Sequence, residues 1–94
     1  MTIDELLKDA RNIWGDDLMQ LPHVAIAAEV IAGDLCRQAR SHIENSPAND
    51  AEVKKELGNL IFSAIRWCDD LGYDPNECIT LARQAQTAYQ SKRT

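Results

Sequence analysis

The sequence lacks a long apolar run, a basic stripe and all but a few aromatic residues, and these absences exclude several classes of protein. No apolar run approaches the roughly 20 residues of a membrane-spanning helix. The N-terminus has no basic segment followed by an apolar one, so we expect neither a signal peptide nor a membrane partner. The net charge is −5, and the sequence has no cluster of basic residues that would bind a phosphate backbone, which argues against nucleic-acid binding.

Cysteine usage points to a reducing compartment. The three cysteines, Cys36, Cys68 and Cys78, are odd in number and are never spaced as C-x-x-C. A disulfide framework or a zinc site is therefore not expected, and reduced thiols in a cytoplasmic protein are the natural interpretation. Cys68 and Cys78 fall on apolar helical faces, where a free cysteine behaves as a small hydrophobic residue.

Helical periodicity and capping residues predict one all-α domain over residues 1–94, with four helices and no strand. Thr2-Ile-Asp-Glu5 forms a capping box that opens a first helix, which closes at Trp14-Gly15. A loop ends at Pro22, and a second helix runs from about His23 to Ile43. A turn-rich linker over residues 44–49 leads to a third helix ending at Leu71, with Gly72 following as the residue that needs a positive φ. Asp74-Pro-Asn-Glu77 caps a last helix that extends to about Gln90.

The two central helices are long, at about 31 Å each, and the short linker makes them antiparallel. The third helix has the cleanest apolar stripe: Val53, Leu57, Leu60, Ile61, Ala64, Ile65, Cys68 and Leu71. We expect the last helix to bury the stripe made of Cys78, Leu81, Ala82, Ala85 and Tyr89. Four helices of this length bury only part of both long stripes, which favours a homodimer or higher homo-oligomer. The alternative is a monomeric bundle with Phe62 and Trp67 half-exposed.

Each central helix carries an acid with a second position of interest one turn away on the same face. In the second helix Asp34 lies one turn from Ile31, and in the third Glu56 lies one turn from Asn59. Two facing helices that each offered two acids at this spacing would hold Mg²⁺, because carboxylates at i,i+3 project from one face. Here each pair has only one acid. Asp34 and Glu56 are therefore either a reduced cation site or two ordinary surface acids beside the helical interface.

Asp69 and Asp70 carry negative charge at the end of the third helix, where it opposes the helix macrodipole. This placement leaves open either a basic partner for the two acids or no role.

Three segments together resemble the MazG-like nucleoside triphosphate pyrophosphohydrolases. Residues 24–35 resemble the family's L-A-x-A-L-x-E-E-x-G-E-L, residues 56–62 its E-L-G-D-L-L-F, and residues 71–77 the start of its L-G-x-D-P-E-E-A-L. The order, spacing and helix count agree over roughly residues 20–90. The resemblance implies an oligomeric four-helix bundle that hydrolyses nucleoside triphosphates to monophosphate and pyrophosphate, with Mg²⁺ held by E-x-x-E and E-x-x-D.

Only some of the family's site residues have a counterpart in this sequence. Its four acids fall on Ile31, Asp34, Glu56 and Asn59, so the resemblance assigns a reduced metal site to Asp34, Glu56 and Asn59. The family's phosphate-binding lysine is missing, and Arg83 is the residue that could hold phosphate in its place. Two charged ligands in place of four predict weak or absent Mg²⁺ binding, and no catalytic residue is assigned.

Three functions remain after this comparison of motifs. The favoured one is a MazG-like protein with lost or reduced pyrophosphohydrolase activity that binds a nucleotide or a protein partner. The alternative is an active Mg²⁺-dependent nucleotide pyrophosphohydrolase with a pared-down site. In the third, the resemblance is accidental helical patterning and the chain is a small interaction module.

Overall fold

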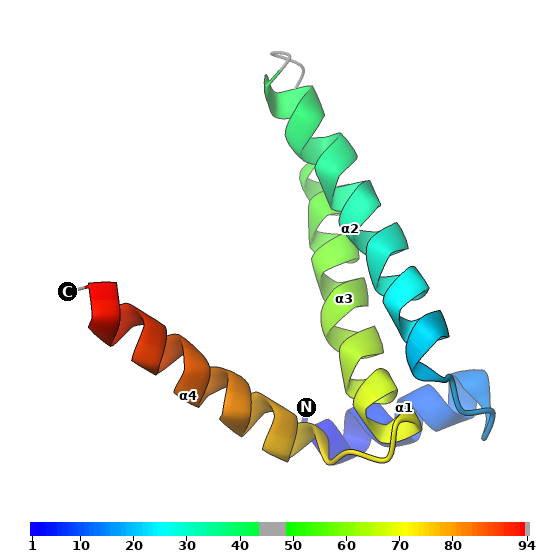
Figure 1. Cartoon of the computed structure of the whole chain (residues 1–94). Coiled ribbons are helices and arrows are strands. Elements are labelled where there is room, and N and C mark those ends of the chain that lie inside the picture. The colour runs from blue at the N-terminus through cyan, green and yellow to red at the C-terminus, as the bar shows by residue number, and fades with distance from the viewer. Residues whose placement is uncertain (44–48, 94) are drawn as a thin grey trace.

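The chain folds into four helices, as seen in a computed structural model that describes residues 1–43 and 49–93. They are α1 (Ile3–Trp14), α2 (Leu21–Ile43), α3 (Asp50–Asp70) and α4 (Pro75–Arg93) (Figure 1). No strand is found in the described residues, so the all-α prediction is confirmed. Over the same residues, none of the helices combines the length and the apolar character needed to cross a membrane.

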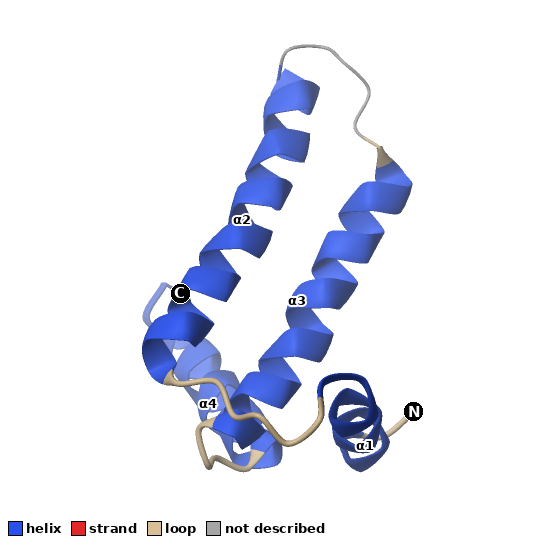
Figure 2. Cartoon of the chain, turned by 90° about the vertical axis from the view of Figure 1, so that its right-hand side faces the viewer, coloured by secondary structure: helices blue, strands red, loops and turns tan. Residues whose placement is uncertain are grey.

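The helices are arranged as an antiparallel pair with two additions. The long helices α2 and α3 lie side by side, as predicted, and α1 packs across the C-terminal end of α3 (Figures 1 and 2). The last helix, α4, leaves this end of α3 and points away from the α2–α3 pair (Figure 1). The long pair is therefore covered at one end by α1, and α4 forms a separate arm.

Local capping fixes most helix boundaries. The Thr2 hydroxyl accepts a hydrogen bond from the Glu5 amide at 3.1 Å, and the Asp74 carboxylate accepts one from the Asn76 amide at 3.0 Å. Gly72 has the predicted positive φ, at 81°, a conformation that other residues adopt only with strain.

Three boundaries differ from the prediction, and one segment is not described; α3 ends at Asp70, one residue before the predicted Leu71. The second helix begins at Leu21 rather than His23, because a proline is tolerated in the first helical turn, where its missing N–H has no intrahelical partner. The last helix continues to Arg93. Most of the predicted linker, residues 44–48, lies outside the described part of the chain. Its last residue, Asn49, caps α3 by accepting a hydrogen bond from the Glu52 amide at 3.2 Å.

The core is small and lies where α1, α2 and α3 meet. Its buried apolar residues are Ala10 of α1, Ile31 of α2, and Ile65 and Trp67 of α3. Trp67 is 7% exposed, so the alternative in which it was half-exposed is wrong for this residue.

The expected burial of the α4 stripe is wrong for the single chain. Every residue from 79 to 93 is exposed, including Leu81 at 59% and Tyr89 at 64%. Only the start of α4 meets the rest of the chain, where Pro75 is buried and Cys78 is half-buried against Cys68 of α3. Burial, followed by the hydrogen bond with Cys78, raises the pKa of Cys68 to about 11. Periodicity correctly predicted an apolar face on α4, but in one chain nothing lies opposite that face.

Candidate functional site

Ile31, the residue that the resemblance aligns with the family's first acid, is a core residue. Its side chain is 7% exposed and lies with Trp67 in the wall of a cavity between α2 and α3. A hydrocarbon side chain offers no lone pair to a hard cation, which binds oxygen ligands. This position therefore contributes packing and no coordination.

Asp34 and Glu56, on the two facing helices, share a cationic neighbour in Lys55. The Lys55 ammonium lies 2.9 Å from Glu52 Oε2 and 3.8 Å from Glu56 Oε1. The pKa of Lys55 is raised, first by its hydrogen bond to Glu52, and further by the charges of Glu56 and Asp34. The protein's own ammonium therefore lies beside Glu52 and Glu56, and Asp34 acts on it only through its charge.

Glu56 is buried, so the interpretation of this residue as an ordinary surface acid is wrong. The residue is 6% exposed, and its Oε2 atom accepts no hydrogen bond from the described residues. A buried carboxylate oxygen without a partner carries a desolvation cost of about 1–3 kcal/mol or more. Asp34 is less buried, with 28% of its side chain exposed, and it forms an ion pair with Arg37 of its own helix.

The predicted donor set fits Mg²⁺ poorly. Magnesium requires near-octahedral oxygen ligands at short range and binds carboxylates that are free to coordinate. Glu56 supplies one unpartnered oxygen, whereas Asp34 is paired with Arg37 and the nearby charge is balanced by Lys55. Within residues 1–43 and 49–93, no three His, Cys, Asp or Glu side chains are grouped so that they could hold a metal ion.

A cavity of about 440 Å³ opens between α2, α3 and the segment that joins α1 to α2. Its aromatic lining residues are Trp14 and Trp67, and its polar ones are Asn59, Ser63 and Arg66, which follow one another along α3 at helical spacing. The volume lies within the range of about 300–1,000 Å³ that is usual for small-ligand sites. The structure therefore places Asn59, the third predicted ligand, in the wall of a mostly apolar cavity.

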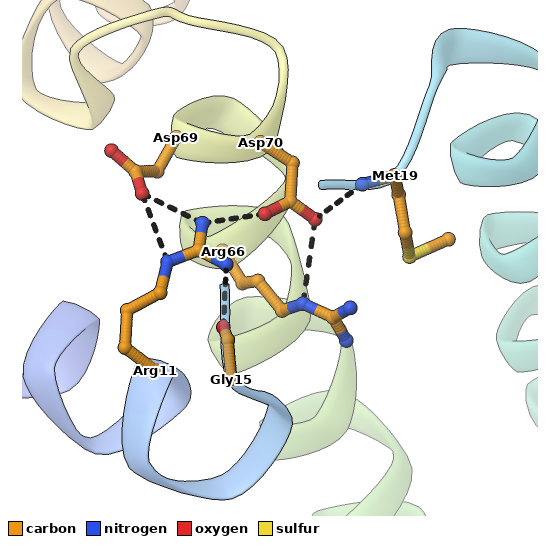
Figure 3. Close-up of polar contacts among 6 residues, drawn as sticks. All are labelled: Arg11, Gly15, Met19, Arg66, Asp69 and Asp70. Carbon is orange, nitrogen blue, oxygen red and sulfur yellow. Dashed lines mark hydrogen bonds and ion pairs between the residues drawn. The ribbon is translucent and has the colours of Figure 1, made fainter. Parts of the chain in front are cut away.

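A network of charges fixes the end of α3 against α1 and the α1–α2 connection (Figure 3). The Asp70 side chain is fully buried and accepts from Arg11 Nη2 at 2.5 Å and from the Met19 amide at 3.3 Å. Arg11 also donates to Asp69 Oδ2, at 2.7 Å from Nη2 and 3.2 Å from Nε. These hydrogen bonds, to Asp69 first and then to Asp70, raise the pKa of Arg11. The two aspartates at the helix end therefore have a basic partner within the same chain.

Arg66 connects this network to the cavity. Its Nε lies 3.4 Å from Asp70 Oδ2, and its guanidinium carbon lies 4.7 Å from the centroid of the Trp14 ring. Only 12% of the Arg66 side chain is exposed, whereas Trp14 is 57% exposed. A guanidinium held over an accessible indole places a cationic group and an aromatic surface together in the lining of the cavity.

The fourth predicted site residue, Arg83, lies apart from the others. It belongs to the exposed part of α4, which points away from the α2–α3 pair (Figure 1). Within one chain the structure therefore brings Asp34 and Glu56 near Lys55 and places Asn59 in the cavity, but leaves Arg83 outside both places.

Sequence reasoning did not predict the roles of Arg11 and Arg66. Arg11 is separated from its acidic partners by 58 and 59 residues, a separation that no helical spacing can reveal. One signal was present, namely the unfavourable charge of Asp69 and Asp70 at a helix C-terminus.

No family model, curated protein or solved structure matches this chain. The function is therefore argued from the residues of the site, because a fold class alone does not determine function.

Proposed function

We propose that this chain is a MazG-like helical protein that binds a nucleotide in the cavity between α2 and α3 and has lost or reduced Mg²⁺-dependent pyrophosphohydrolase activity. The observation that carries the proposal is Ile31, which is buried in the wall of this cavity at the position of the family's first acid. An acid at this position would coordinate the metal ion, whereas isoleucine packs in the core and supplies no ligand.

The surroundings of the other acids support the same conclusion. Lys55 provides a positive charge beside Glu52 and Glu56, and this charge also interacts with that of Asp34. An ammonium that neutralises carboxylates competes with a divalent cation for the same oxygens. Loss of tightly bound Mg²⁺ removes the group that would neutralise charge on the phosphates during hydrolysis.

The cavity offers surfaces that suit a nucleotide. An exposed indole can stack on a planar base, and such aromatic contacts contribute about 0.5–1.5 kcal/mol beyond the burial of area. Asn59 and Ser63 offer polar groups to the edge of a base, and Arg66 places a positive charge at the same cavity. We further propose that the protein acts as a homodimer or higher homo-oligomer in a cytoplasmic setting.

A second candidate, hydrolysis at a pared-down site, is favoured by one observation. Oε2 of Glu56 is buried without a hydrogen-bond partner among the described residues, and a bound cation would satisfy it. In that case Glu56, with Asp34 and Asn59, would hold Mg²⁺, which would supply charge neutralisation to the substrate phosphates.

Calorimetric titration with a non-hydrolysable nucleoside triphosphate, with and without Mg²⁺, tests both candidates. We expect binding without Mg²⁺, because the cavity and not a metal supplies the contacts. The variant Asn59→Leu should weaken binding at least about tenfold, because it replaces a polar group in the cavity wall and changes its shape. The matched control is Asn12→Leu, which changes an exposed asparagine on α1 and should leave affinity unchanged.

Two other outcomes would overturn the first candidate. Binding that requires Mg²⁺ and disappears in Glu56→Gln, together with pyrophosphate release from a hydrolysable nucleotide, would replace the first candidate with the second. No heat in either titration, with a folded protein, would exclude nucleotide binding.

A further inference from the structure

The apolar face of α4 is directed toward α3 but reaches it only at one end. Cys78, which contacts Cys68 of α3, belongs to the same helical face as Leu81, Ala85 and Tyr89 by their spacing of three, seven and eleven residues. Because α4 diverges from α3 near its start (Figure 1), the rest of this face is exposed.

A matching apolar stripe runs along α3. Leu57, Ile61 and Cys68 lie on one side of this helix at spacings of four and seven residues, and Leu57 and Ile61 are 46% and 63% exposed. Cys68 is the end of this stripe that touches α4. The two stripes therefore line the two arms of an open V that meets at Cys68 and Cys78.

The surface of the single chain is too large for a compact monomer of its mass. Its accessible surface is 7320 Å², whereas a compact protein of 10.5 kDa exposes about 5,400 Å². Its radius of gyration is 15.7 Å, against about 12 Å for a compact domain of this length. The excess is roughly 1,900 Å² per chain, and two chains that covered it would bury an area in the range of obligate dimers, about 2,000–5,000 Å².

Charge indicates what covers the arm. All 15 Asp and Glu residues lie in residues 1–77, together with seven of the 10 Lys and Arg residues, which gives this part a net charge of −8. The remainder contains Arg83, Lys92 and Arg93 and no acid, which gives +3, and α4 as a whole, with Glu77, carries +2. The α4 arm is therefore complementary in charge to the body of another copy of the same chain.

We propose that two copies exchange their arms, so that α4 of each copy lies along the Leu57–Ile61 stripe of α3 in the other. The inference rests on the homodimer proposed above and specifies how that dimer is formed. It accounts for three observations at once: the two exposed stripes, the excess surface and the opposite charges of arm and body.

Sedimentation at micromolar concentrations tests the proposal with three variants. Ala85→Glu places a charge on the apolar face of α4, and Ile61→Lys places one on the stripe of α3. Thr87→Glu is the matched control, because it makes a similar acidic change at an equally exposed position on the opposite face of α4. We expect dimers for the wild type and Thr87→Glu, and at least about 100-fold weaker dimers for Ala85→Glu and Ile61→Lys, since each buries two unpaired charges per dimer.

Mixing the two defective variants provides the decisive measurement. In an exchanged heterodimer, the arm of the Ile61→Lys copy lies on the α3 stripe of the Ala85→Glu copy, and neither surface of this contact is altered. In the other contact, the carboxylate introduced by Ala85→Glu lies on the stripe that carries the ammonium introduced by Ile61→Lys. The mixture should therefore form dimers although neither variant does so alone.

Each contrary result removes a defined part of the proposal. A wild-type monomer whose radius of gyration in solution is near 12 Å would mean that α4 closes on its own α3, and would overturn both the dimer and the exchange. A wild-type dimer that tolerates either Ala85→Glu or Ile61→Lys, or a mixture that stays monomeric, would overturn the exchange alone. Nucleotide binding is measured separately and does not depend on either result.

Discussion

Removing Arg11 should destabilise the protein more than removing a charged side chain that is well exposed. The substitution Arg11→Met keeps much of the aliphatic stem but deletes the donors to Asp70, at 2.5 Å, and to Asp69, at 2.7 and 3.2 Å. The Asp70 side chain is fully buried, and breaking one partner away from a buried ion pair costs about 3–5 kcal/mol. Asp70 retains the Met19 amide and Arg66, which reduces the expected loss to about 2–3 kcal/mol.

Urea unfolding followed by circular dichroism, at one fixed protein concentration, measures this loss. The control is Arg37→Met, which removes an ion pair with Asp34 from a side chain that is 75% exposed, and should change stability by no more than about 0.5 kcal/mol. Equal effects of the two substitutions would refute the assignment of Arg11 as the buried partner. A double-mutant cycle of Arg11→Met with Asp70→Asn should give a coupling energy of about 1.5 kcal/mol or more.

Three other predictions concern the core, the thiols and the acidic cluster. Ile31→Ala should lower the unfolding free energy by about 2–3 kcal/mol in the same urea assay. The control is Val30→Ala, at a residue that is 61% exposed, which should lower it by about 0.5 kcal/mol or less. Similar losses for the two variants would show that Ile31 is not a core residue. The pKa of Cys68 is raised to about 11, so its thiol should react with iodoacetamide appreciably only as the pH approaches 11. At pH 8, mass spectrometry should show that the exposed Cys36 is labelled first. Since that pKa lies above the ordinary 9.0, the unfolded thiol loses its proton first, and this group's contribution to stability declines between these two pH values. Lys55→Gln should raise the affinity for Mn²⁺ several-fold in calorimetry, because it removes the competing charge; unchanged affinity would contradict the role given to this ammonium.

Much of the fold could be predicted because the signals that determine it are local. Thr2, Gly72 and Asp74 each act within a few residues, and all three take the capping roles expected of them. The antiparallel arrangement of α2 and α3 likewise follows from a short connection between two long amphipathic helices. The start of α2 was missed by two residues because Pro22 suits either the end of a loop or the first turn of a helix.

The site could be predicted less well because it depends on what lies opposite each residue. Periodicity placed Leu81 and Tyr89 on an apolar face, but burial of that face requires a partner surface that spacing does not specify. Glu56 has the sequence environment of a surface acid, and its burial results from the approach of α2. The pairing of Arg11 with Asp70 joins residues 59 positions apart, so only the assembled fold reveals it.

The Arg11–Asp70 pair also has a consequence for the order in which the molecule folds. The antiparallel hairpin of α2 and α3 needs only residues 21–70 and forms through contacts that are close in sequence, which is the fast route in small helical proteins. Arg11 and Asp70 are 59 positions apart, but most of the entropy of closing that loop is lost when the hairpin forms, and docking of α1 then closes only the segment between Arg11 and Leu21. During synthesis from the N-terminus, Arg11 of α1 therefore has no ion-pair partner until the last turn of α3 has been made. We expect α1 to be the last of the first three helices to become protected from hydrogen exchange.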